Sequence, residues 1–172
     1  KENITVRNLL LHNSGLRAWR PYYNNHSSAY EVINAIMNED IDYPTGSKMV
    51  YSDPGMITLQ KIIENISGLT LDEFVKKNIF VPLNMNRTMY NPPRELWYNI
   101  PPTQPDYKGK VHDENAAILG GVAGHAGLFA PASDLAVFCK MMLQKGKYGN
   151  REYIKPETIE NWTSKQSIQS SR

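Results

Sequence analysis

The 172-residue sequence lacks several features that would assign it directly to a class of protein. It has one cysteine, Cys139, so an internal disulfide is excluded. It has no apolar run close to the roughly 18 residues of a membrane-spanning helix. Its 19 lysine and arginine residues are scattered among 17 acidic residues rather than clustered, which argues against nucleic acid as a partner.

Several signatures of catalysis and ligand binding are also missing. The sequence contains no Gly-x-Ser-x-Gly and no His-Glu-x-x-His. The glycines at 120–127 lack the endings of a phosphate loop, so we expect a tight backbone passage with His125 packed and hydrogen-bonded. His112, Asp113 and Glu114 are adjacent and cannot all face one ion on a helix or strand. We therefore expect no metal and no cofactor, and a loop whose polar side chains bind nearby amides.

Helical patterns dominate what is present. With 41% hydrophobic and 21% charged residues, the chain has the composition of a folded globular protein. One apolar face recurs at i, i+3, i+4 and i+7, in Leu59, Ile62, Ile63 and Ile66. Other helices are expected after Thr5, after Ser28 (burying Tyr30, Ile33 and Ile36 or Met37), after Thr70, after Pro131 and over 156–162. We predict a mainly α fold, with short extended segments only at 50–51 and 127–129.

The most informative stretch lies just before the helix that carries this face. Asp53 is expected to cap the helix, and Pro54 suits the first helical position. Tyr51 and Ser52 are thereby placed at the mouth of a helix N-terminus. A phenol with a pKa near ~10 becomes a useful base only beside a cation. Lys48 is close in sequence without being fixed there, so spacing alone favours a structural tyrosine over a catalytic one.

Five motifs, in order, resemble the serine β-lactamase-like family, which includes class C β-lactamases, DD-peptidases and related esterases. Tyr51-Ser52-Asp53 resembles its Tyr-x-Asn motif, and residues 111–129 with Asp134-Leu135 are similar to a subgroup of exported bacterial serine hydrolases. The other motifs are residues 4–16, 62–68 and 80–85. Each motif alone is weak, but the ordered set spans residues 4 to about 146 and is a strong signal.

The resemblance implies the helical lobe of the β-lactamase/penicillin-binding-protein-like α/β fold, with at most short β segments. We expect a single partial domain over 1–172, with a polar tail over about 164–172. The resemblance also implies a periplasmic or otherwise extracytoplasmic location and a small-molecule or peptidoglycan-like substrate. It implies catalytic roles for Tyr51 and Asp53 and substrate-binding roles for Ser52, His112, Asp113 and Asn115.

The sequence departs from the family pattern in two ways. No Ser-x-x-Lys occurs in the 172 residues, and the His-x-Gly at 125–127 lies too close to Tyr51 to be the family's third motif. We therefore expect a piece of a longer protein whose sheet domain packs against it, and self-association of the isolated piece through an open apolar face. Asp53 also replaces the family's Asn, and an ionised Asp cannot donate a hydrogen bond. This weighs against recognition of a β-lactam or peptide amide and leaves ester hydrolysis open.

The expected function is acyl transfer through an acyl-enzyme, on a β-lactam, a peptide or an ester. Tyr51 would relay the proton and Asp53 would hold the lysine, and this chain alone is expected to be inactive. The alternative is a non-catalytic binding or sensor module of the same fold, and a third reading is a purely structural lobe. A Ser-x-x-Lys encoded directly upstream would favour the enzyme.

Overall fold

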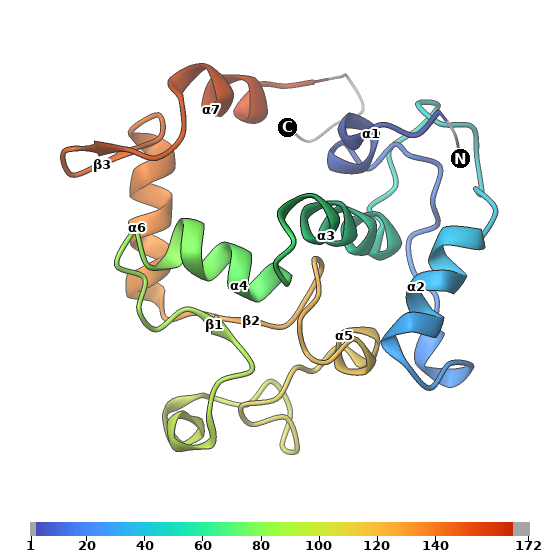
Figure 1. The fold of residues 1–172 in the computed structure, drawn as a ribbon, viewed down its shortest axis with the longest axis horizontal. Helices are drawn as coiled ribbons and strands as arrows, with labels where there is room; N and C mark the ends of the chain where they lie inside the picture. The colour runs from blue at the N-terminus through green and yellow to red at the C-terminus, as the bar shows by residue number, and fades with distance from the viewer. Residues whose placement is uncertain (1–2, 167–172) are drawn as a thin grey trace.

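The computed structural model describes residues 3–166, which form a mainly helical fold with two short antiparallel pairs of strands (Figure 1). The predicted fold class is confirmed. Of the polar tail expected over 164–172, residues 167–172 lie outside the described residues. The elements are, in order, α1 (Val6–Leu10), η1 (Tyr22–Asn24), α2 (Ala29–Asn38), α3 (Asp53–Ser67), α4 (Leu71–Val75), η2 (Lys76–Phe80), β1 (Met89–Tyr90), η3 (Arg94–Asn99), α5 (Glu114–Ile118), β2 (Leu128–Phe129), α6 (Ala132–Leu143), β3 (Lys147–Tyr148), β4 (Arg151–Glu152) and α7 (Pro156–Thr163).

Helix α3 is the central element, and α1, α2 and α4 all contact it (Figure 1). Ser52 caps it: its Oγ accepts from the Gly55 amide at 3.0 Å and donates to the Arg17 carbonyl at 2.6 Å. The cap predicted at Asp53 was therefore wrong by one position, because Asp53 already has the first helical place. Gly68, with φ 69°, ends the helix in the left-handed region, as the sequence indicated.

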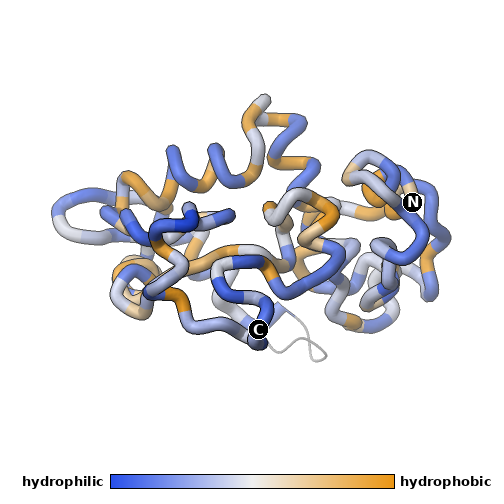
Figure 2. Tube along the Cα trace, turned by 90° about the horizontal axis from the view of Figure 1, so that it is seen from below, coloured by the Kyte–Doolittle hydropathy of each residue, from blue (hydrophilic) through white to orange (hydrophobic). Residues whose placement is uncertain are grey.

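The core consists of three clusters, and α3 contributes to two of them. Ile57 packs with Tyr22, Val32 and Ile36, between α3 and α2, while Leu59 packs with α1 on the other side. The third cluster joins the end of η2 to α6 and contains Phe80, Leu83, Met85 and Met141. Along the trace, apolar residues occur in short stretches that alternate with polar ones (Figure 2).

Two residues expected in the core are exposed. Tyr30 is 79% exposed and Ile66 is 82% exposed. Helix α2 buries Val32 in place of Tyr30, together with Ile36 as predicted, and this pair one turn apart faces α3. Ile66 lies in the last turn of α3, beyond the contacts that α3 makes with the core clusters.

The strands form two separate pairs, of which β1 with β2 joins distant parts of the chain and β3 with β4 joins neighbouring ones. β1 pairs with β2 antiparallel, Met89 opposite Phe129 and Tyr90 opposite Leu128, so the extended segment predicted near 127–129 is confirmed. Residues 50–51 are not a strand, although the Val50 amide does bind the His12 carbonyl at 2.7 Å. β3 and β4 were not predicted. In the part of the chain that the structure describes, no helix has the length and apolarity to cross a membrane.

Candidate active site

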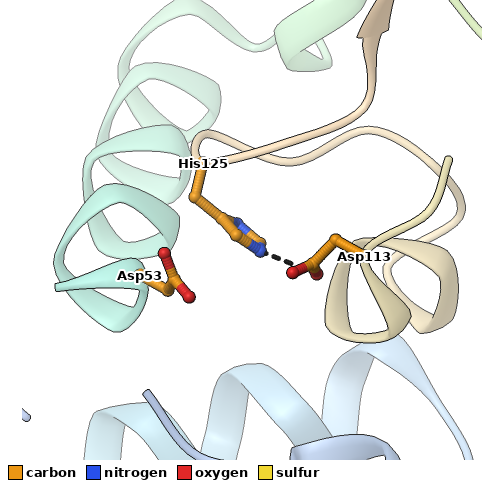
Figure 3. A group of neighbouring side chains, drawn as sticks. All are labelled: Asp53, Asp113 and His125. Atoms are coloured by element: carbon orange, nitrogen blue, oxygen red, sulfur yellow. Dashed lines mark hydrogen bonds and ion pairs between the residues drawn. The ribbon is translucent and has the colours of Figure 1, made fainter. Parts of the chain in front are cut away.

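Three segments that are far apart in sequence meet at the N-terminus of α3. Asp53 comes from the first turn of α3, Asp113 directly precedes α5, and His125 lies in the glycine-rich loop of residues 120–127. Figure 3 shows the three side chains converging on one space. One ligand atom from each lies within 4.8 Å of the other two. These residues, together with Tyr51, form what we call the α3 cluster.

Asp113 is held in place by its own helix and by His125. Its Oδ1 accepts from the Ala116 amide at 2.7 Å, which caps α5, and lies 3.0 Å from His125 Nε2. The hydrogen bond from His125 lowers the pKa of Asp113, and the backbone amides act in the same direction against the opposing effect of burial. Asp113 is therefore ionised at neutral pH.

His125 is fixed by a loop that passes very close to α3. A Cβ added to Gly124 would lie 2.3 Å from the Met56 carbonyl oxygen, so only glycine fits there. Gln60 binds the loop at two points, donating to the Val122 carbonyl at 3.1 Å and accepting from the Gly124 amide at 3.0 Å. The His125 side chain is 2% exposed. The tight passage and the packed, hydrogen-bonded histidine expected from the sequence are both confirmed.

Tyr51 and Asp53 interact with each other in an acidic environment. Burial raises the pKa of Tyr51, and the charge of Asp53, its hydrogen bond with the phenol and the charge of Asp113 raise it further. Burial also raises the pKa of Asp53, to which Asp113 adds while His125 partly offsets it. The Nζ of Lys48 lies 4.6 Å from the centre of the Tyr43 ring, and the charges that shift the pKa of Tyr51 are those of Asp53 and Asp113. Tyr51 is therefore a neutral phenol in this environment.

The predicted substrate-binding residues divide into two groups. Ser52 and Asn115 are each 1% exposed and are engaged within the fold, Ser52 as the cap of α3 and Asn115 through a bond to the Arg20 carbonyl at 2.8 Å. His112 and Asp113 instead line a cavity of about 640 Å³ between the loop before α5 and β2. The His112 ring packs on Tyr107 at 4.4 Å between centroids. Their roles toward a substrate stay predictions.

Sequence reasoning did not bring His125 together with Asp53. The adjacent residues His112, Asp113 and Glu114 had drawn attention to a local cluster, but only Asp113 belongs to the α3 cluster. Asp53 and His125 come from segments far from Asp113, so the spacing of residues within one motif could not show that the three meet. The one usable signal was the run of glycines around His125, which indicated a close approach of two backbones.

The structure is a helical lobe with Tyr51 and Asp53 at the N-terminus of its central helix α3. This is the fold that the order of the sequence motifs implied. The chain belongs to the beta-lactamase family, whose sequence model matches residues 1–169. It is 32% identical to a Bacillus subtilis N-acetylmuramyl-L-alanine amidase over 95% of this chain and 43% of the relative. It is 31% identical to an Escherichia coli K12 protein provisionally named a D-alanyl-D-alanine carboxypeptidase, over 95% of this chain and 44% of that protein.

Solved structures show the same fold. The octameric penicillin-binding protein homologue from Pyrococcus abyssi matches with a TM-score of 0.64 and 25% identity, covering 91% of this chain and 37% of that one. The chain thus spans less than half of the length of the relatives that it matches.

Proposed function

We propose that this chain forms the helical side of a serine hydrolase active site that cleaves an amide or ester carbonyl through an acyl-enzyme. The observation that carries the proposal is the pairing of Tyr51 with Asp53 at the mouth of α3, where the phenol is 54% exposed while its carboxylate neighbour is fixed by the helix. The names of the relatives, an amidase and a carboxypeptidase, support a peptidoglycan-like substrate and an extracytoplasmic location.

The proposal assigns the nucleophilic serine and its lysine to the remainder of the same polypeptide, because the 172 residues contain no Ser-x-x-Lys. The serine hydroxyl would attack the carbonyl carbon and lose its proton toward Tyr51, and the proton would then pass to the leaving group. Water would attack the acyl-enzyme in the second half of the reaction and release the acid. The lysine ammonium beside Asp53 would lower the pKa of Tyr51, which this chain alone holds raised.

Hydrolysis assays test whether the nucleophile lies in another part of the polypeptide. The 172-residue chain is expected to hydrolyse neither nitrocefin nor p-nitrophenyl acetate above a Tyr51→Phe control. In the full-length parent, Tyr51→Phe should lower kcat by roughly 10²–10⁴-fold, the usual contribution of a general acid–base group. Turnover by the 172-residue chain that depends on Tyr51 would contradict the assignment of the nucleophile to another part of the polypeptide.

A second candidate is a binding or sensor module that keeps the fold without catalysis. The acidic surroundings of Tyr51, which hold it as a neutral phenol, favour this reading over an isolated enzyme. The sequence encoded directly upstream separates the two: Ser-x-x-Lys supports the hydrolase, and its absence supports the module. Labelling of the parent with a fluorescent penicillin would further separate a peptidase from an esterase.

The proposed packing partner is a sheet domain of the same polypeptide. Large apolar side chains are exposed in several elements, among them Leu10, Ile66, Leu143 and Trp162. An uncovered apolar surface favours self-association. Sedimentation of the 172-residue chain should therefore show an apparent mass that rises with concentration, and a monomer at high concentration would count against this partner.

A further inference from the structure

The α3 cluster has an unusual balance of charge. Among residues 3–166, no lysine or arginine forms a salt bridge with Asp53 or Asp113, and His125 is the partner of Asp113. Two carboxylates thus face His125 in a partly buried site, and His12 is a second imidazole whose charge acts on Asp53. Buried charges in proteins are normally paired or coordinate a metal ion.

Other poorly exposed carboxylates in the molecule form salt bridges or accept hydrogen bonds. Glu39, whose side chain is 10% exposed, pairs with Arg17 and Arg20. Glu64, at 15%, pairs with Lys61. Asp134, at 8%, accepts from the Arg87 amide and the Thr88 hydroxyl. Asp53 has the Tyr51 phenol as a hydrogen-bond donor, and what sets the α3 cluster apart is that a second carboxylate, Asp113, faces it in the same partly buried site.

We propose that Asp53, Asp113 and His125 bind a divalent transition-metal ion of the Zn²⁺ type. Imidazole nitrogen and carboxylate oxygen are both zinc ligands, and three protein ligands with a fourth position left for water are a common zinc arrangement. An ammonium group would need only the carboxylates, whereas a transition metal uses all three side chains. The inference concerns a carboxylate, Asp53, that the proposed hydrolase assigns to a lysine, and it is tested by metal binding rather than by hydrolysis, so the two proposals fail on different measurements.

The geometry needs little adjustment to accept the ion. Zinc–ligand distances of about 2.0–2.2 Å place neighbouring donor atoms roughly 3.4 Å apart. His125 Nε2 and Asp113 Oδ1 are already 3.0 Å apart, and one donor atom from each of Asp53, Asp113 and His125 lies within 4.8 Å of the other two. Rotation of the Asp53 side chain in the first turn of α3 closes the remaining gap.

The buried imidazole is the anchor of the proposed site. Its ring is 2% exposed and is held by a loop that is pinned to α3 through Gln60, so it is pre-positioned before any ion binds. His125 Nδ1 is buried and has no hydrogen-bond partner among the described residues. Neutral His125 would bind the ion through the Nε2 lone pair, with the ring proton on Nδ1.

Direct binding to the 172-residue chain tests the proposal. After removal of trace metals with a chelator, titration calorimetry with ZnCl₂ should show one ion per chain. Co²⁺ should give the visible absorption bands of a tetrahedral site. Asp113→Asn is the key variant, because asparagine can still cap α5 while it is a poor ligand. We expect it and Asp53→Asn to weaken zinc binding at least tenfold, since even second-shell changes cost roughly 10–100-fold.

Matched variants separate this site from the neighbouring sequence cluster. Glu114→Gln removes the carboxylate next to Asp113, and His112→Gln removes the adjacent imidazole, which packs on Tyr107. Both should bind zinc like the unmodified chain, and His125→Gln should not, with circular dichroism to confirm its fold. The proposal is overturned by the absence of one-to-one binding, by unchanged affinity in Asp53→Asn or Asp113→Asn, or by a loss that follows His112 or Glu114 instead.

Discussion

The carboxylates at the two ends of α3, Glu64 and Asp53, lie in opposite electrostatic environments. Near the C-terminal end, Glu64 accepts from Gln60 at 3.0 Å, from the Leu71 amide at 3.2 Å and from Lys61 at 2.5 Å. At the N-terminal end, Asp53 faces another carboxylate and has no lysine or arginine partner among the described residues. Burial alone would raise both pKa values; the donors around Glu64 overcome it and lower that pKa, whereas the pKa of Asp53 is raised.

The difference separates a structural end of the helix from a functional one. Glu64 ties α3 to the start of α4, and every partner is supplied within the described chain. Asp53 has no lysine or arginine partner in the described chain. Its partner would come from elsewhere, as either the lysine of the proposed hydrolase or the proposed metal ion. Sites that are built for binding often sacrifice local stability in this way.

The largest expected effect on stability comes from a substitution in the buried middle of α3. Ile57 is fully buried between α3 and α2, so Ile57→Ala should lower the free energy of unfolding by roughly 2–5 kcal/mol. Ile66→Ala on the same helix is the matched control; because Ile66 is 82% exposed, its effect should stay within about 0.5 kcal/mol. Urea unfolding measures both, and equal losses would refute the core assignment.

The next effect compares the two carboxylates directly. Glu64→Gln should destabilise the fold by roughly 1–3 kcal/mol at neutral pH, because it weakens charge-assisted hydrogen bonds. The folded pKa of Glu64 is lowered, so this contribution is present above its unfolded pKa of about 4.3 and is lost as the pH falls through the folded value. The difference between Glu64→Gln and the unmodified chain should therefore shrink in acid.

Asp53→Asn is the matched control for that experiment. With a chelator present, so that no ion contributes, it should leave the free energy of unfolding unchanged or raise it, because burial and Asp113 disfavour the ionised form of Asp53. A loss as large as that of Glu64→Gln would remove the contrast between the two ends of the helix.

The smallest effect concerns the cap of α3. Ser52→Ala should destabilise the fold by about 0.5–2 kcal/mol, because the Gly55 amide loses its acceptor. Asp53→Ala should cost less, since Asp53 lies inside the helix and caps no amide, and the loss of its hydrogen bond with Tyr51 is offset by relief from burial and from the charge of Asp113. Thermal unfolding measures the stability of both variants. A larger loss in Asp53→Ala than in Ser52→Ala would support Asp53 as the cap, as predicted from the sequence.

Local patterns predicted most of the helices, whereas α5 forms next to His112 and Asp113, where a loop was expected. The helices expected after Thr5 and Thr70 are both present, and each begins with a capping box, completed by Asn8 and by Glu73. Exposure was predicted less well, as Tyr30 shows, because an apolar stripe on a helix does not reveal which of its edges another helix will cover.

The sequence by itself determined the mainly helical fold, the family and the position of Tyr51 and Asp53 at a helix mouth, because periodicity, caps and motif order are local properties of the chain. Only the tertiary structure decided that His125 and Asp113 meet Asp53. That meeting depends on Gln60 holding the 120–127 loop against α3 and on Gly124 fitting against the Met56 carbonyl. Contacts between segments so far apart in sequence leave no periodic trace, so no local pattern encodes them.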